Sequence, residues 1–334
     1  MMELFELLKT LVSEPSPSGG EAAVRACIRA LVEPVADTVE EDVMGNLIAL
    51  KKAKNPGAKR VMLSAHMDSV GLIVTFIEEQ GFLRFSNLGG VNPTALLHAP
   101  VRFANGTRGV IAKEDKVAVK DLKLHDLFID IGAGNREAAE ACVRVSDVAL
   151  YATETVLQGD RVFSPYLDNR IGCAVLLDVF RRLETPENDV YAVFSVQEEL
   201  GLRGAQTVAF AVEPDVGLAI DVTRTGDTPG VKPKMACVLG GGAAIKVMDR
   251  SLICAPELVR GLERCAKAHG VPYQFEVLEA GGTDAGAIQR SRGGVLSGAV
   301  SIPARYIHAP VETVCMGDAQ AAAELLRHFA REAL

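Results

Sequence analysis

The spacing of apolar residues divides the chain into regions of different pattern. Four leucines between residues 4 and 11 recur at helical spacing, and a second amphipathic helix follows the serines and glycines of "SPSGGEAAVRACIRALV" at 16–32. Apolar runs at 46–50 and 60–66 then predict two buried strands. The first part of the chain is therefore expected to be α/β.

The middle of the chain has a different pattern. From Gly71 onwards, short apolar or alternating segments such as "LIVTFI" (72–77) and "FLRFSN" (82–87) are separated by Gly, Asn, Pro and Lys. This pattern is typical of short strands joined by turns. One helix is expected at 135–142. The segment is therefore predicted to be mainly β.

Alternation of helices and strands returns after about residue 164 and continues to a closing helix at 319–334. Because both ends of the chain share this pattern, we predict one α/β domain made of residues 1–71 and 164–334. The β domain is inserted between them at 72–163.

Composition and charge narrow the function. The 334 residues are 49% hydrophobic and carry a net charge of -8 without a basic run, which argues against a nucleic-acid partner. No apolar run is long enough to span a bilayer, and the start "MMELFELLKT" lacks a signal pattern, so a cytoplasmic protein is expected. The seven cysteines include no CxxC pair, which argues against a disulfide framework and a thiolate zinc site.

Potential catalytic side chains follow the predicted strands of the α/β region. His66 and Asp68 end one strand, Glu198 and Glu199 end another, and Asp221 ends a third. Sites in open α/β sheets are built at this edge, because the loops that leave it converge on one crevice. The sequence therefore points to a site at the carboxyl ends of these strands.

Each candidate also has a simpler interpretation. His66 alone is more often a surface histidine, Asp168 before a helix is by local rules an N-cap, and Asp221 precedes a turn. His308 lies among prolines, and the glutamate pair could be a solvated helix start. All of these explanations would have to coincide at one edge of the sheet, so a common site is favoured.

Two histidines with several carboxylates suit one or two divalent ions such as zinc, cobalt or manganese. A dinuclear centre needs a bridging carboxylate and leaves one carboxylate free as a general base. Adjacent glutamates cannot easily serve one metal, but one can bind metal while the other accepts a proton. The pair Glu198–Glu199 is interpreted in this way.

An ordered set of motifs resembles one known family along essentially the whole chain. The motifs include "SAHMDSVG", "YLDNRIGCAVLLD", "VQEELGLRGAQ", "AIDVTRTGDTPG" and "SIPARYIHAPVETV". They are similar to those of the tetrahedral (TET) aminopeptidases, dinuclear enzymes that include glutamyl and leucyl aminopeptidases, with some relatives labelled endoglucanase. The resemblance implies a three-layer α/β/α zinc-aminopeptidase-like catalytic domain and a β-rich dimerisation domain, either a barrel or PDZ-like. It also implies short peptides as substrates and a dodecamer built from dimers.

The resemblance also implies roles for individual residues. Two divalent metal ions per subunit, zinc first, with cobalt or manganese as alternatives, would be held by five ligands: His66 and Asp221 on one ion, Glu199 and His308 on the other, and Asp168 as the bridge. Glu198 would be the general base, and Asp68 would orient His66. The substrate's α-amine would bind a metal, and the peptide between Asp168 and Asn169 would be cis.

Two positions depart from the family, with Ser69 in place of a glutamate and Ala309 in place of a serine. Thr283 and Asp284 could cap a helix or contact substrate.

Three other functions remain open. A glycoside hydrolase is disfavoured because the chain has no Trp and few aromatic residues. A deacylase or carboxypeptidase would use the same metal scaffold, and a binding protein would hold a purely structural metal.

Overall fold

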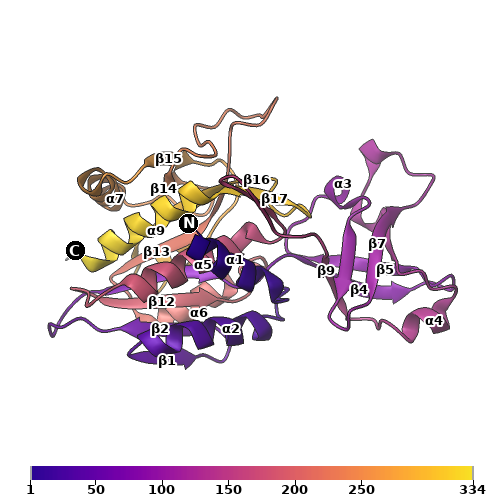
Figure 1. The fold of residues 1–334 in the computed structure, drawn as a ribbon, viewed down its shortest axis with the longest axis horizontal. Helices are drawn as coiled ribbons and strands as arrows, with labels where there is room; N and C mark the ends of the chain where they lie inside the picture. Colours follow the sequence, from indigo (N-terminus) through magenta and orange to yellow (C-terminus); the bar gives the residue numbers. More distant parts are fainter. Residues whose placement is uncertain (1, 333–334) are drawn as a thin grey trace.

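The computed structural model describes residues 2–332, which form a large α/β unit and a smaller β-barrel joined to its side (Figure 1). The α/β unit contains both ends of the described chain, and the barrel lies between them in sequence. The mixed α/β fold with a separate β unit agrees with the prediction. No helix in the described residues has the length and apolar character needed to cross a membrane.

The large unit is built on an 11-stranded sheet in the order β1-β2-β12-β3-β13-β16-β17-β11-β10, with β14 pairing to β16 and β15 to β14. The central strands β12, β3, β13 and β16 are parallel, so their carboxyl ends meet at one edge. The strands are β1 (Thr38–Glu41), β2 (Leu47–Lys51), β3 (Arg60–His66), β10 (Val156–Gln158), β11 (Arg161–Ser164), β12 (Asp189–Ser195), β13 (Val216–Arg224), β14 (Ala243–Met248), β15 (Tyr273–Val277), β16 (Leu296–Arg305) and β17 (Glu312–Cys315).

Helices cover both faces of this sheet and give the expected three layers. One face is covered by α1 (Met2–Ser13), α2 (Ala22–Val32), α5 (Leu167–Arg182), α7 (Pro256–His269) and α9 (Met316–Arg331). The opposite face is covered by α6 (Arg203–Val212) and α8 (Asp284–Gln289). A short 3-10 helix, Glu33–Val35, follows α2.

The smaller unit is a closed barrel with the strand order β4-β5-β8-β7-β6-β9 and its own hydrophobic core. Closure leaves no free sheet edge in this unit. The strands are β4 (Gly71–Ile77), β5 (Leu83–Leu88), β6 (Pro100–Phe103), β7 (Arg108–Lys113), β8 (Leu127–Asp130) and β9 (Val148–Tyr151). Helices α3 (Pro93–Leu96) and α4 (Arg136–Glu140) and the 3-10 turns Val119–Asp121 and Leu124–Asp126 connect them.

Several strands escaped the sequence prediction because local pattern does not reveal their partners. Strand β1 reads "TVEE" at the sheet edge, and β17 begins with a glutamate. Strand β14 carries the buried Lys246, which is paired with Glu276 and with Asp249. Strand β11 falls in the segment that was correctly expected to be mainly β, but it pairs with β17 of the large sheet.

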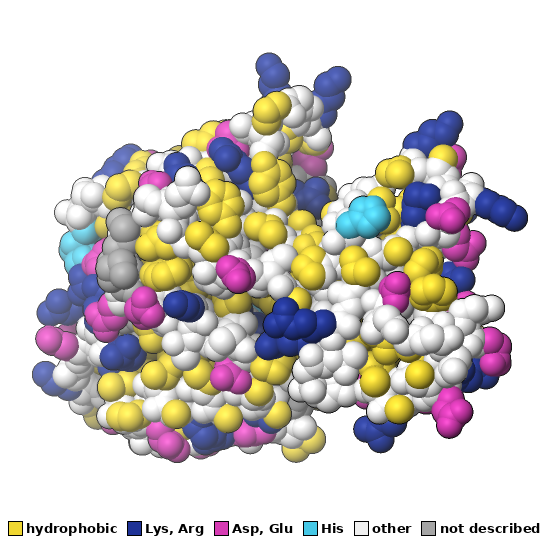
Figure 2. Space-filling view, turned by 45° about the vertical axis from the view of Figure 1, so that its right-hand side comes forward, with side chains coloured by type: hydrophobic (Ala, Val, Ile, Leu, Met, Phe, Trp, Pro, Cys, Tyr) yellow, Lys and Arg dark blue, Asp and Glu magenta, His cyan; other side chains and the backbone are white. Residues whose placement is uncertain are grey.

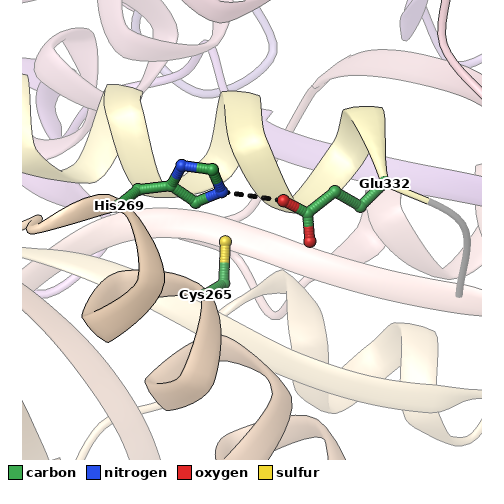
Figure 3. Close-up of side chains that lie close together, drawn as sticks. All are labelled: Cys265, His269 and Glu332. Atoms are coloured by element: carbon green, nitrogen blue, oxygen red, sulfur yellow. Dashed lines mark hydrogen bonds and ion pairs between the residues drawn. The ribbon is translucent and has the colours of Figure 1, made fainter.

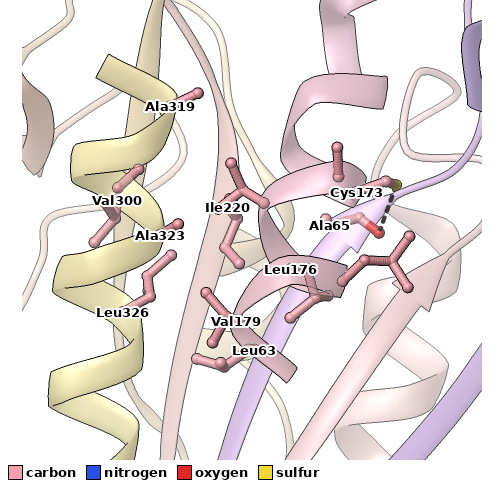
Figure 4. Close-up of a cluster of buried hydrophobic side chains, with 14 of the residues drawn as sticks. Leu63, Ala65, Cys173, Leu176, Val179, Ile220, Val300, Ala319, Ala323 and Leu326 are labelled. Carbon is pink, nitrogen blue, oxygen red and sulfur yellow. Dashed lines mark hydrogen bonds between the residues drawn. The ribbon is translucent and has the colours of Figure 1, made fainter. Parts of the chain in front are cut away.

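The main core lies between the sheet and the helices α5 and α9. Figure 4 shows Leu176 of α5 and Leu326 of α9 among the strand residues Leu63, Ile220 and Val300. All five side chains are almost completely buried. This packing fixes α5, whose first residues carry part of the site, against the strands that carry the rest.

We expect Leu176→Ala to lower the free energy of unfolding by about 2–5 kcal/mol, because truncation leaves a cavity in a close-packed layer. Denaturant unfolding followed by circular dichroism measures the change. Val43→Ala is the control, because Val43 is fully exposed and its loss should change stability by less than about 0.5 kcal/mol. Equal effects of the two substitutions would contradict the assignment of the core.

Candidate active site

The structure brings the predicted side chains together at the carboxyl edge of the parallel strands. His66 is the last residue of β3 and pairs with Ser195, the last residue of β12. The two glutamates at 198 and 199 follow β12 directly, and Asp221 lies near the end of the adjacent β13. These side chains therefore lie together at one edge of the sheet, although β13 continues beyond Asp221 to Arg224.

Asp168 lies at the centre of this group and does not act as a helix cap. Its backbone is not helical, and its peptide bond to Asn169 is cis, as the resemblance implied. Its Oδ1 lies 3.2 Å from His66 Nε2 and its Oδ2 lies 3.1 Å from His308 Nε2. The N-cap interpretation, which local rules favoured, is wrong because both carboxylate oxygens face imidazoles.

Two groups of metal-donor side chains share this aspartate. His66, Asp168 and Asp221 form one group, and within each group the donor atoms lie within 4.8 Å of one another. The second group is Asp168, Glu199 and His308, in which His308 Nε2 is 3.1 Å from Glu199 Oε1. The five side chains proposed from sequence as ligands are thus adjacent.

Glu198 and Asp68 complete the cluster from different directions. Glu198 lines the cleft, and its Oε2 is 3.9 Å from His66 Nε2. Asp68 is fully buried behind the site, where its carboxylate accepts hydrogen bonds from the backbone N–H groups of Glu198 and Glu199 and from the Ser18 hydroxyl. Asp68 Oδ1 also lies 3.4 Å from His66 Nδ1. A single carboxylate therefore positions both glutamates and the first histidine.

The cleft above these residues has a volume of about 400 Å³. Its remaining wall is formed by Arg224 and by small or apolar residues that include Leu202, Leu278 and Ile307. The loop before α8 contributes Gly281 and Gly282 to this wall.

The loop residues Thr283 and Asp284 are not part of the cleft wall. Thr283 occupies the N-cap position of α8, but its side chain makes no capping hydrogen bond. Asp284 lies behind the cleft and accepts hydrogen bonds of 2.6 Å from the hydroxyls of Ser64 and Ser195.

Glu312 is a residue of the site that sequence reasoning missed. It is buried, and its carboxylate accepts hydrogen bonds from the backbone N–H of Asp168 (2.8 Å) and of His308 (2.6 Å). The sequence held only a weak signal, a glutamate four residues after His308.

The two positions that depart from the family pattern, Ser69 and Ala309, lie outside the cleft wall. The Ser69 hydroxyl donates a hydrogen bond to the Ser16 carbonyl.

Burial and neighbouring charges shift the ionisation of the site. Burial raises the pKa of the Glu198 carboxyl well above its ordinary value, and Asp221 and Glu199 add to this effect against the charge of His66. Burial also opposes a charge on His308, but Asp168 and Glu199 outweigh it and raise the pKa of His308 to about 12. Without a bound cation, the neighbouring carboxylates therefore keep the two histidines protonated.

The same contacts fit a bound metal. A single nitrogen, His308 Nε2, lies 3.1 Å from oxygens of both Asp168 and Glu199. Among the described residues, the buried Glu199 Oε1 has no hydrogen-bond partner, although His308 Nε2 lies 3.1 Å away. His66 Nε2 likewise faces oxygens of Asp168 and Asp221, the latter at 3.6 Å. Such a donor set satisfies hard to borderline divalent ions.

The cleft combines two groups of metal-donor side chains with one further glutamate, Glu198. This arrangement is typical of metal-dependent hydrolases. A family model described as M42 glutamyl aminopeptidase matches residues 45–325. A protein of Acetivibrio thermocellus, provisionally named an aminopeptidase, is 48% identical over 325 residues, which cover 97% of each chain. The chain belongs to the M42 family and is a metal-dependent aminopeptidase, a hydrolase of peptide bonds.

Solved structures agree with this assignment. The aminopeptidase APDkam598 from Desulfurococcus kamchatkensis has a TM-score of 0.95 and 40% identity, and the match covers 99% of this chain and 95% of that one. The TET1 peptidase of Pyrococcus horikoshii, described as assembling into a tetrahedron or a large octahedral shell, has a TM-score of 0.85 and 33% identity over 98% and 99% of the two chains. A structure named PhTET1-12s, described as a dodecamer, has a TM-score of 0.88 and 32% identity over 98% of each chain.

The metal-free protein should lose stability as pH rises above about 6.5. The folded pKa of His308 exceeds the ordinary value of 6.5, so its protonation stabilises the fold fully below that pH and progressively less above it. The raised pKa of Glu198 acts in the same direction. We expect the free energy of unfolding of chelator-treated protein to fall by about 1 kcal/mol per pH unit between pH 6.5 and 9, and its melting temperature to fall with it.

His308→Gln removes one of these groups and should flatten the pH dependence. Differential scanning fluorimetry of both proteins at matched ionic strength measures the slopes. An unchanged slope in the variant would show that His308 does not retain its proton in the metal-free site.

Proposed function

We propose that the chain holds two divalent ions per subunit. His66 and Asp221 would bind one ion, Glu199 and His308 the other, and Asp168 would contribute one oxygen to each. The observation that carries this proposal is the position of Asp168, whose two oxygens face different histidines at 3.2 and 3.1 Å. The donors suit zinc, with cobalt or manganese as alternatives.

The bound ions would polarise the scissile carbonyl and lower the pKa of the attacking water. Glu198 would accept the proton of that water and then donate it to the departing amine. The backbone N–H of Glu198 donates to Asp68 at 2.9 Å, and this contact holds the main chain of the base in place. Because the side chain lines the cleft and is only about one-tenth exposed, it can reach substrate while bulk water is largely excluded.

The substrates would be short peptides with a free N-terminus. A cleft of about 400 Å³ suits a residue or two of extended peptide, rather than a folded chain. The α-amine of the substrate would bind one of the ions in its neutral form, which requires a free N-terminus and distinguishes these substrates from those of a deacylase. Leu202, Leu278 and Ile307 give the wall an apolar side.

Glu198→Gln should lower kcat for aminoacyl-p-nitroanilides by about 10²- to 10⁴-fold, because the amide cannot accept the proton of water. Metal content, measured by inductively coupled plasma mass spectrometry, should stay at that of the wild type. Glu184→Gln is the control, because Glu184 is exposed and lies outside the cleft.

The same assay tests the metal and the substrate class. Wild-type activity should vanish with chelator and return with zinc or cobalt, across a panel with Leu, Glu, Asp, Lys and Ala at the N-terminus. Retained activity in Glu198→Gln would contradict the role of the base. Preferential cleavage of N-acylated substrates would favour a deacylase, and preferential release of C-terminal residues would favour a carboxypeptidase.

We infer that the segment 72–163, which contains all of the barrel strands β4–β9 except the first residue of β4, forms the dimerisation unit of a dodecamer. The dodecameric PhTET1-12s supports this inference. Hydrophobic side chains are visible on the barrel surface (Figure 2), and Phe76 (50% exposed) and Val145 (53% exposed) are among the exposed apolar residues of this unit. Exposed apolar groups of this kind are candidates for burial between subunits.

Light scattering after size-exclusion chromatography should give twelve copies of the 35.5 kDa chain, about 426 kDa. Phe76→Glu should shift this mass toward smaller species, because a charge would be buried in the interface. A monomeric mass for the wild type at micromolar concentration would contradict the assembly.

We also propose a reducing, cytoplasmic location. All seven cysteines are free thiols, and five of them are buried, which suits a compartment that keeps thiols reduced.

A further inference from the structure

A second cluster of metal-donor side chains lies where helix α7 meets the end of α9. Cys265 and His269 belong to α7, and Glu332 directly follows α9 (Figure 3). Residues four apart share one face of a helix, so the thiol and the imidazole point the same way. None of the three residues lines the catalytic cleft.

The three donor atoms already lie close together. They fall within 4.8 Å of one another, and His269 Nε2 is 2.8 Å from Glu332 Oε1. Figure 3 shows the sulfur of Cys265 pointing toward the space between the imidazole and the carboxylate. A tetrahedral zinc ion, with bonds of about 2.0–2.3 Å, needs donors about 3.3–3.8 Å apart. Small side-chain shifts therefore suffice to form the site.

The imidazole is held in place by its other neighbours. The ring of His269 stacks on the ring of His328 at 3.6 Å with an interplanar angle of 12°. His328 Nε2 lies 3.1 Å from Arg327 Nη2 and is engaged there. The stacking orients His269 without using its Nε2, so this nitrogen remains available to exchange its contact with Glu332 for a metal bond.

An ion can reach the cluster from the surface. Cys265 and Glu332 line a hollow of about 400 Å³, together with Arg264, Ala268 and Phe329. The thiol is buried in the fold, with only 6% of Cys265 exposed, whereas the carboxylate of Glu332 is about half exposed. The thiol and the carboxylate therefore line one hollow, and His269, which does not line it, contacts the same carboxylate.

We propose that Cys265, His269 and Glu332 form a metal site for zinc or another borderline divalent ion, separate from the catalytic centre. Thiolate, imidazole and carboxylate are the donors that zinc takes in proteins, and water would fill the fourth position. The absence of a CxxC pair argued against a thiolate zinc site, but this site uses one cysteine and draws its other donors from the helix face and from α9. The bound ion would connect the end of α7 to the end of α9.

Cobalt(II) provides a probe that separates this site from the catalytic one. The proposed catalytic donors are all nitrogen or oxygen, so a thiolate-to-cobalt charge-transfer band in the near ultraviolet reports only a cysteine ligand. Chelator-treated full-length protein should develop this band on titration with cobalt(II), saturating at one equivalent of thiolate-bound metal per chain. Cys265→Ser should abolish the band and leave cobalt-dependent peptidase activity within about twofold of the wild type.

Two further variants keep the test decisive. Glu332→Gln preserves the size of the side chain and should weaken the cobalt affinity of this band by at least about tenfold. Cys142→Ser is the matched control, because Cys142 is the exposed thiol and the most accessible alternative ligand. Absence of the band in the wild type, its persistence in folded Cys265→Ser, or its loss in Cys142→Ser would overturn the proposal.

Discussion

The structure depends on holding several carboxylates together at one edge of a sheet. Asp168, Glu198, Glu199 and Asp221 surround two imidazoles, and in water their like charges would drive them apart. The fold opposes this repulsion by fixing the main chain on which these groups stand. Asp68 accepts hydrogen bonds from the backbone N–H groups of Glu198 and Glu199. The strands of the α/β unit form the rigid support behind these residues.

Close approach of the barrel adds to this constraint. Gly89, which follows β5, has a φ of +76°, and a Cβ at this position would lie 3.1 Å from the side chain of Glu199. Glycine therefore meets two requirements at once, a left-handed backbone and room for a carboxylate. The barrel is thus in contact with the catalytic centre as well as forming a separate unit.

Much of the site could be predicted because parallel strands collect their carboxyl ends. An apolar run leads into each of three positions, His66, the glutamate pair and Asp221. The sequence therefore predicted that these side chains share one edge of the sheet. Asp168 was harder, because its local pattern is that of an N-cap and only the resemblance gave it another role. Glu312 was not found, since its partners are backbone N–H groups, which carry no sequence signal. The same limit explains the missed strands β14 and β17, whose pairing is decided by distant segments.

The hydrogen bond from the Tyr151 hydroxyl to the His308 carbonyl, at 3.2 Å, joins the last strand of the barrel to the loop that carries His308. The histidine at that loop has a φ of +67°, a conformation that a non-glycine residue keeps only when its surroundings enforce it. An insertion that braces such a loop cannot be exchanged freely for another of similar size. The barrel and the α/β unit are therefore expected to change together, because this contact carries any shift of the barrel into the loop that holds His308 at the cleft.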